Sequence, residues 1–189
     1  MPTASQCFMA RKLGVKVYID GANMFYTQKD LGWIFDWKKI KKIVEKKFWV
    51  DEFVYYTPLR EEKKKQVKQI EKLKRWGYGV KTKPPKLIKG EFKANFDVEI
   101  SVDIVLSLVS GWKGDFVIFS GDSDFAYLVR ILQKKFKRRV FVFSTRKFLS
   151  WELSYLADKC FFLEDLKKEI FFKNWLLTKS PKSGKRKIR

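Results

Sequence analysis

The sequence of 189 residues contains no histidine. This absence excludes a Ser-His-Asp triad, a Cys-His pair and a zinc site with histidine ligands. An enzyme with this sequence must therefore rely on carboxylates, lysines, hydroxyl groups or a bound cofactor. The two cysteines, Cys7 and Cys160, are too few for a disulfide framework or a zinc knuckle, and we interpret both as ordinary thiols.

Long apolar runs are also missing. No stretch approaches the roughly 18–20 residues that a membrane-spanning helix needs. The first residues, MPTASQCFMARKL, lack the apolar region of a signal peptide. We therefore expect a cytoplasmic protein without a membrane partner.

Acidic residues are scarce relative to basic ones, with 21 Asp and Glu against 42 Lys and Arg, which gives a net charge of +21. Such an excess favours a polyanionic partner, most simply a nucleic acid. A lysine-rich surface that only serves solubility is the alternative. A membrane surface is less favoured, because no clear basic amphipathic helix with an exposed apolar face is visible.

Hydrophobic residues make up 46% of the chain and aromatic residues 17%, which is typical of a globular domain. Strand-like and helix-like segments alternate along it, and this alternation predicts an α/β fold with a mainly parallel sheet and helices on both faces. We expect a turn at Gly21, a loop over 87–95 and a disordered basic tail over 175–189. The expected strands are 16–20, 52–57, 78–85, 115–120, 138–144 and, at an edge, 159–163; the expected helices are 35–48, 60–77, 125–136 and 150–158.

The segment FDVEISVDIVLSLV, residues 96–109, fits two patterns. Its first half alternates apolar and polar residues, as a strand does, whereas its five apolar positions from Val98 to Val109 form a stripe at helical spacing. About 14 residues is long for a strand, and a parallel connection between the strands on either side requires a crossover. These considerations favour a helix.

Aspartates occur where strands of the predicted sheet end. Asp20 ends the strand KVYID, and Asp122 and Asp124 follow DFVIF. Because ligands bind beyond the carboxyl ends of parallel strands, these acids and Asp97, at the start of the helix that leads into DFVIF, are expected to converge. Clustered carboxylates repel one another unless a cation compensates, and Mg²⁺ prefers such oxygen ligands. The pattern therefore indicates a metal site that acts on phosphodiesters.

Each acid also has a simpler interpretation. Asp20 precedes a glycine and fits an ordinary turn, and Asp122 or Asp124 fits the N-cap of the helix that follows. Asp103 lies six residues after Asp97 and so on another face of the helix, where a solvated or ion-paired role is more usual. We rank Asp97 well above Asp103, and we interpret Glu99 as solvated.

Four stretches occur in the order of a known family: YIDGANMF, the K-x-x-x-D pattern of KANFD, SGDSDFAYLV and LSYLADKCFFL. Together they resemble the NYN domain in its LabA-like branch, within the PIN-like nuclease superfamily. The resemblance covers residues 14–165, which we expect to form the domain, with an extension over 1–13 and a helix end plus basic tail over 166–189.

The resemblance implies a PIN-like three-layer α/β/α sandwich with a central parallel sheet, a Mg²⁺ or Mn²⁺ site and metal-dependent cleavage of RNA. It implies that the metal and the catalysis depend on Asp20, Asp97, Asp122 and Asp124, with Asp103 as a secondary metal candidate. Asn23, Ser120 and Ser123 would position the loop, a ligand or a water. One departure is that Asn95 and Phe96 stand where the family usually has glycine and a small apolar residue.

The expected function is a metal-dependent, endonucleolytic ribonuclease acting on single-stranded RNA. Lys93 is a candidate for a substrate phosphate, and Lys81, Lys83, Lys86 and Lys89 are candidates for backbone contacts that carry no sequence preference. One alternative is a module of the same fold that binds RNA or protein without turnover. Another is a phosphatase or a nucleotide-sugar transferase, because Asp-x-Asp motifs bind metal there too. The sequence leaves open whether the chain forms a homo-oligomer.

Overall fold

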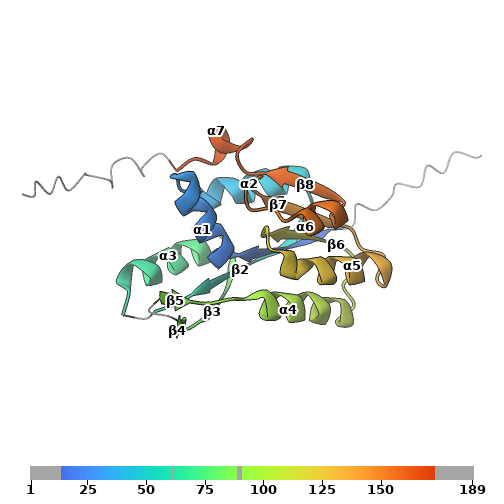
Figure 1. Cartoon of the computed structure of the whole chain (residues 1–189), viewed down its shortest axis with the longest axis horizontal. Coiled ribbons are helices and arrows are strands. Elements are labelled where there is room, and N and C mark those ends of the chain that lie inside the picture. Colours follow the sequence, from blue (N-terminus) through green and yellow to red (C-terminus); the bar gives the residue numbers. More distant parts are fainter. Residues whose placement is uncertain (1–13, 61, 89–90, 173–189) are drawn as a thin grey trace, which may run out of the picture.

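A six-stranded sheet forms the centre of the molecule in the computed structural model, which describes residues 14–60, 62–88 and 91–172 (Figure 1). The strands lie in the order β3-β2-β1-β6-β7-β8, and every neighbouring pair is parallel. The predicted α/β class with a parallel sheet is confirmed, and the segment expected at an edge is the edge strand β8. Their bounds are β1 Val15–Asp20, β2 Val50–Pro58, β3 Gly79–Lys83, β6 Asp115–Phe119, β7 Val140–Ser144 and β8 Lys159–Phe162.

Helices cover both faces of this sheet and complete three layers (Figure 1). One face packs against α1 (Gly21–Leu31), α2 (Trp37–Lys47), α3 (Lys64–Arg75) and the short α7 (Lys167–Ile170). The other packs against α4 (Asp97–Val109), α5 (Ala126–Lys134) and α6 (Trp151–Leu156). The strand β1 is apolar over most of its length because its side chains enter both cores: Val17 and Ile19 face the first group of helices, and Tyr18 faces the second.

The ambiguous segment 96–109 is the helix α4, as favoured. Its contacts with the core come from Ile100 and Ile104, which are fully buried. The five-residue stripe that indicated a helix lies on the opposite side, where Val98 is 72% exposed and Val109 75% exposed. This helix is therefore apolar on both its core side and its solvent side.

Two expectations about local structure were wrong. Residues 87–95 do not form a simple loop: β4 (Lys86–Ile88) and β5 (Glu91–Lys93) pair as a small antiparallel hairpin. The turn expected at Gly21 is not formed, because Gly21 is the first residue of α1. This helix ends at Leu31, and the residue that follows it, Gly32, has the left-handed conformation. The three-residue strands are too short to show a periodicity, and α1 buries few large apolar side chains, so neither pattern was visible in the sequence.

The structure describes the chain as far as residue 172 at its C-terminal side. The expected extension over 1–13 and the expected tail over 175–189 lie outside the described residues. Residues just before that tail belong to the fold, since Ile170 is buried and Phe171 forms a β-bridge with Phe35. Within the described part of the chain, no helix has both the length and the apolar character needed to cross a membrane.

Candidate metal centre

Three carboxylates meet at the carboxyl edge of the sheet. Asp97, Asp122 and Asp124 each offer one oxygen, and these oxygens lie within 4.8 Å of one another. Asp97 is the first residue of α4, while Asp122 and Asp124 follow β6 and begin the short 3-10 helix η1 (Ser123–Phe125). The structure thus brings Asp97 together with two acids that lie 25 and 27 positions further along the chain, because α4 begins at the edge of the sheet where β6 ends.

The backbone around Asp97 is held from both sides. The Asp97 N–H donates to the side-chain oxygen of Asn95 at 2.8 Å, and Phe96 is buried against Tyr56 with ring centroids 5.9 Å apart. The two residues that depart from the usual family pattern therefore fix the backbone before α4. Asn95 accepts the hydrogen bond from Asp97, and Phe96 packs into the core. One oxygen of Asp97, Oδ2, is buried and has no hydrogen-bond partner among the described residues.

The loop that carries Asp122 and Asp124 is equally constrained. Asp122 is the N-cap of η1 and accepts a hydrogen bond from the Asp124 N–H at 3.1 Å, so the predicted capping role falls to Asp122. Its own N–H donates to the Oγ of the fully buried Ser120 at 3.2 Å. Below the loop, a Cβ on Gly121 would collide with the Phe148 carbonyl, so only glycine fits. Ser123 lies exposed in η1.

Asp20 lies at the end of β1 and is almost fully buried. It is the N-cap of α1, where its Oδ1 accepts from the N–H groups of Ala22 and Asn23, each at 3.0 Å. Burial raises the pKa of Asp20 to about 6, with further increases from the charges of Asp97 and Asp122, partly offset by the two N–H donors. Asp20 thus lies within electrostatic reach of the three-carboxylate cluster.

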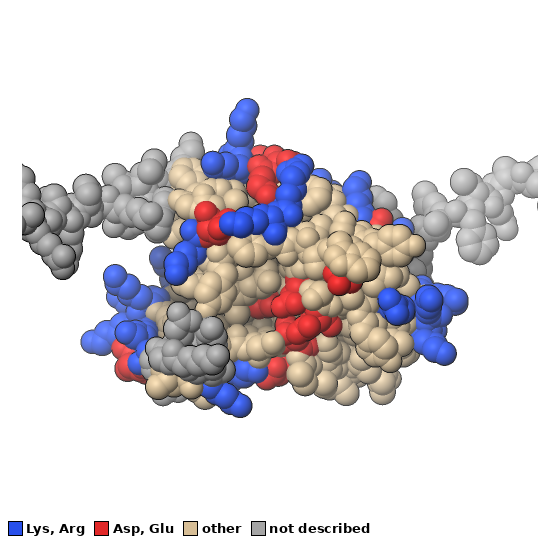
Figure 2. Space-filling model, in the orientation of Figure 1, with Lys and Arg blue, Asp and Glu red and all other residues tan. Residues whose placement is uncertain are grey.

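The pKa of Asp97 is raised as well. Burial is the main cause, followed by the neighbouring charges of Asp122 and Asp124, while the Asn95 contact lowers it. Figure 2 shows the acidic patch in the middle of this face, surrounded mainly by uncharged side chains, with Lys and Arg towards the margins. Among the described residues, no Lys or Arg forms an ion pair with the cluster, and a bound cation would neutralise its negative charge.

The carboxylate oxygens of the three-residue cluster suit a hard divalent cation. Carboxylate oxygens are the ligands that Mg²⁺ and Mn²⁺ prefer. The partnerless buried Oδ2 of Asp97 is the kind of atom that such an ion would satisfy. Cys160 is the one described cysteine and is not part of the cluster, so a soft-metal site is not indicated here.

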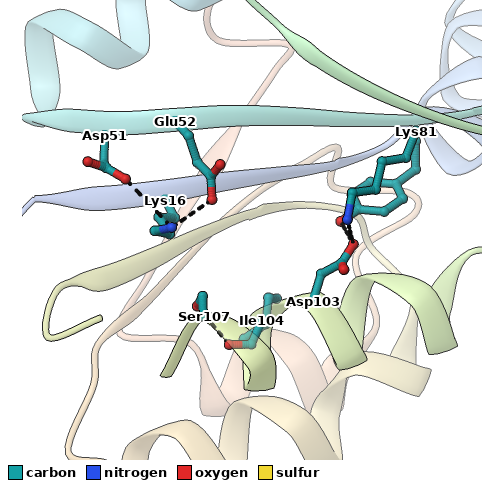
Figure 3. Close-up of polar contacts among 8 residues, drawn as sticks. Lys16, Asp51, Glu52, Lys81, Asp103, Ile104 and Ser107 are labelled. Atoms are coloured by element: carbon teal, nitrogen blue, oxygen red, sulfur yellow. Dashed lines mark hydrogen bonds and ion pairs between the residues drawn. The ribbon is translucent and has the colours of Figure 1, made fainter. Parts of the chain in front are cut away.

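Asp103 does not join this cluster, although it was a secondary candidate ligand. It accepts hydrogen bonds from the Tyr56 hydroxyl and from Lys81 Nζ, the latter at 2.7 Å. Figure 3 shows Asp103 pointing towards Lys81, on the side of α4 that also faces Lys16 and its partners Asp51 and Glu52. Six residues of helix separate it from Asp97 and turn it towards β2 and β3, as its position in the sequence indicated.

The candidate lysines have several different placements. Lys81 pairs with Asp103, and Lys83 pairs with Glu99, so Glu99 is not the solvated residue that was expected. Lys86 is exposed in β4, and Lys93 lies opposite it in β5. The Lys93 side chain and all of Lys89 lie outside the described parts of the structure, and their proposed roles stay predictions.

Comparisons with known proteins identify the family of this chain. The family model described as the NYN domain matches residues 14–164. The chain belongs to the NYN domain family. Proteins of this family are generally nucleases of the PIN-like fold that use divalent metals, so a nucleic-acid substrate and a metal at the acidic cluster are consistent with membership.

This NYN protein is similar to one known protein in sequence and to one solved structure in fold. It is 29% identical over 163 residues to the "Low amplitude and bright protein LabA" of Synechococcus elongatus, covering 82% of this chain and 86% of the relative. A crystal structure of a protein of unknown function from Vibrio parahaemolyticus superposes with a TM-score of 0.74 at 21% identity. That match covers 91% of this chain and all of the other, and it shows a shared fold.

Proposed function

We propose that this NYN protein is a metal-dependent ribonuclease that cleaves RNA endonucleolytically, with Mg²⁺ or Mn²⁺ held by Asp97, Asp122 and Asp124. The observation that carries the proposal is the convergence of these three carboxylates, together with the buried Oδ2 of Asp97, which has no hydrogen-bond partner among the described residues. When bound, such an ion stabilises negative charge on a phosphodiester and increases the acidity of water. The net charge of +21 supports a long polyanion as substrate over a small phosphate ester.

The residues around the cluster have supporting roles in this proposal. Asp20 adds negative charge beside the three ligands and is the candidate for a fourth, while it holds the start of α1. Asn23 accepts a hydrogen bond from the Gly121 N–H at 3.4 Å and thereby joins the α1 end to the Asp122 loop. Ser120 fixes the Asp122 backbone, and the exposed Ser123 is available to a substrate or a water.

The test is cleavage of a labelled single-stranded RNA in Mn²⁺, Mg²⁺ or EDTA. We expect metal-dependent cleavage by the unaltered protein and a loss of roughly 100-fold or more in Asp122→Asn, as for removal of a group that stabilises transition-state charge. Asp103→Asn is the matched control, because it makes the same change to an acid on the other side of α4 and should retain the activity.

Two results would contradict the proposal. RNA binding without cleavage by the unaltered protein in any metal would indicate a binding module on the same fold. Turnover of a chromogenic phosphate monoester without cleavage of RNA would indicate a phosphatase instead.

A further inference from the structure

Among the residues that the structure describes, the positive charge on this face does not surround the acidic cluster. On the face shown in Figure 2, basic side chains gather away from the central acidic patch, including over α3. The described cations that could hold a polyanionic substrate on this face therefore lie at some distance from the cluster. The question is which surface connects the two.

A cleft between α1 and α3 leads from such cations to the start of α1, the residue after Asp20. Its inner part, with a volume of about 260 Å³, begins at Gly21 and Ala22, directly after Asp20, and also reaches Ala94 near the start of α4. Its outer part has a volume of about 840 Å³. The two parts share the side chains of Phe25, Gln28, Gln69 and Leu73, so they are continuous.

The outer part has an apolar floor and a basic rim. Phe35, Trp37 and Trp76 contribute to the floor. Four lysines contribute to the rim, and among the described residues none of them has an acidic partner: Lys29, Lys65, Lys68 and Lys72. In contrast to Lys81 and Lys83, which are neutralised by acids of α4, these cations are available to an external anion.

The lysines of α3 are arranged along the cleft. Lys65, Lys68 and Lys72 follow one another at spacings of three and four residues, so they share one face of the helix. They extend over about 10 Å at about 1.5 Å per residue, which is longer than a single phosphate group. This spacing suits a chain of phosphates better than one anionic head group.

Aromatic rings stand exposed where the inner and outer parts join. Phe25 is 61% exposed and Tyr26 48% exposed, and their rings meet edge to face with centroids 5.6 Å apart. Exposed aromatic rings beside cations form the platforms on which proteins stack unpaired bases. A base-paired duplex hides its base faces and could not use these rings.

We propose that the α1–α3 cleft binds the single-stranded RNA that flanks the scissile phosphate, with phosphates on Lys65, Lys68 and Lys72 and a base on Phe25. This inference rests on the proposed ribonuclease function for the identity of the polyanion. The continuity of the cleft with the end of β1 and its unpaired cations favour RNA over an isolated amphiphilic anion such as a fatty acid. The strand would enter over α3 and reach the acidic cluster past Gly21.

Binding in EDTA tests the cleft without cleavage. A fluorescein-labelled single-stranded RNA of about 20 nucleotides is titrated with the full chain, and binding is followed by fluorescence anisotropy at several salt concentrations. This RNA is longer than the sites of roughly 4–16 nucleotides that single-strand binding domains cover. We expect the triple variant Lys65→Ala, Lys68→Ala, Lys72→Ala to bind about 10-fold more weakly or worse. The slope of the logarithm of its association constant against the logarithm of the salt concentration should be smaller in magnitude by about 2. Each lost phosphate contact with a single strand reduces this slope by about 0.7.

The matched control removes three exposed lysines from another helix. Lys38, Lys42 and Lys46 lie on the solvent side of α2, and their replacement by alanine lowers the net charge by the same amount. We expect a loss of less than about 3-fold in that triple, because distant charges are screened by salt. Equal losses in both triples would overturn the proposal, because net charge and not the cleft would then govern binding. No loss in the α3 triple would also overturn it, because these lysines would then make no contact with the RNA.

Two further measurements separate this inference from the proposed function. Phe25→Ala should weaken binding of single-stranded RNA by about 10-fold, as the loss of one stacked base does, and leave the melting temperature unchanged. Weakening of duplex binding by the same factor would contradict base stacking. In Mn²⁺, the triple variant of α3 should cleave the long RNA more slowly than the unaltered protein does. Both proteins should cleave a trinucleotide at the same rate.

The two proposals can fail separately. Absence of cleavage in the unaltered protein would count against the ribonuclease, while the binding data would still decide the cleft. Stabilisation of the unaltered protein by oleate, with equal RNA binding in both triples, would reassign the cleft to an amphiphile.

Discussion

The side-chain oxygen of Asn23 accepts a hydrogen bond from the backbone N–H of Gly121, 98 residues further along the chain. Asn23 lies in the first turn of α1, which Asp20 caps, and Gly121 precedes Asp122. One contact thus connects the two loops that carry acids from neighbouring strands. It joins the junction of β1 and α1, which carries Asp20, to the loop after β6, which carries Asp122.

Replacement of Asn23 by alanine should loosen this connection. We expect a loss of about 0.5–1 kcal/mol in the free energy of unfolding, because a neutral hydrogen bond of 3.4 Å contributes modestly. The specific readout is hydrogen exchange by NMR. The Gly121 amide should exchange faster in Asn23→Ala, while the amide of Val117 in the middle of β6 keeps its rate; unchanged exchange at Gly121 would contradict the role of Asn23.

Mn²⁺ should stabilise the protein through Asp97, Asp122 and Asp124. At about 100 times the dissociation constant, a bound ion adds about 2.7 kcal/mol, or roughly 5–10 °C in melting temperature for a domain of this size. Asp97→Asn should melt higher than the unaltered protein in EDTA, because it removes a repelled and buried charge. It should then gain little from Mn²⁺, whereas Asp103→Asn should gain the full amount. An equal response of both variants to Mn²⁺ would place the ion elsewhere.

The sheet and most helices could be predicted because their signals are local. Runs such as DFVIF are apolar almost throughout, as strands buried on both faces are, and the order of segments then implies the parallel sheet. The helix α1 gave no such signal. Its large apolar side chains Phe25 and Tyr26 face solvent, and its buried positions include Gly21 and Thr27, so no apolar stripe marks it. A capping Asp20 and a glycine at position 32 were the available indications.

Part of the candidate site could also be predicted from the sequence, and part could not. Acids that follow strands could be placed at one edge from the topology alone, and the structure brings Asp97, Asp122 and Asp124 together there. The surroundings of Asp103 could not be placed, since its partners Lys81 and Tyr56 lie 22 and 47 residues away. The cleft along α3 was equally hidden, because it requires the relative position of two helices from different crossovers.

The contact between Tyr56 and Asp103 should contribute to stability and not to cleavage. Tyr56 is fully buried, and its hydroxyl donates to a carboxylate, which makes this bond worth about 1.5–3 kcal/mol. The pair of Asp103 with Lys81, which is 55% exposed, should contribute less than about 1 kcal/mol. Urea denaturation of Tyr56→Phe, Asp103→Ala and the double variant measures the coupling. Additive losses, or a larger loss in Lys81→Ala than in Tyr56→Phe, would contradict this ranking.

Asp20 should make the metal-free protein less stable as the pH rises from about 4 to about 6. Its pKa is about 6 in the folded protein and about 4 in an unfolded chain, so in this interval the folded state binds more protons. Below the interval the carboxyl is protonated in both states. Above it the full cost of a buried charge, roughly 1–3 kcal/mol, is present.

The substitution Asp20→Asn removes this charge and keeps an acceptor oxygen for the N–H groups of Ala22 and Asn23. The variant should therefore match the unaltered protein at about pH 4 and exceed its stability at about pH 7 in EDTA, with a weaker slope between them. The slope that remains reflects Asp97, whose pKa is raised in the same direction. Urea denaturation at closely spaced pH values measures both curves, and a variant that is less stable than the unaltered protein at neutral pH would show that the Asp20 charge stabilises the fold.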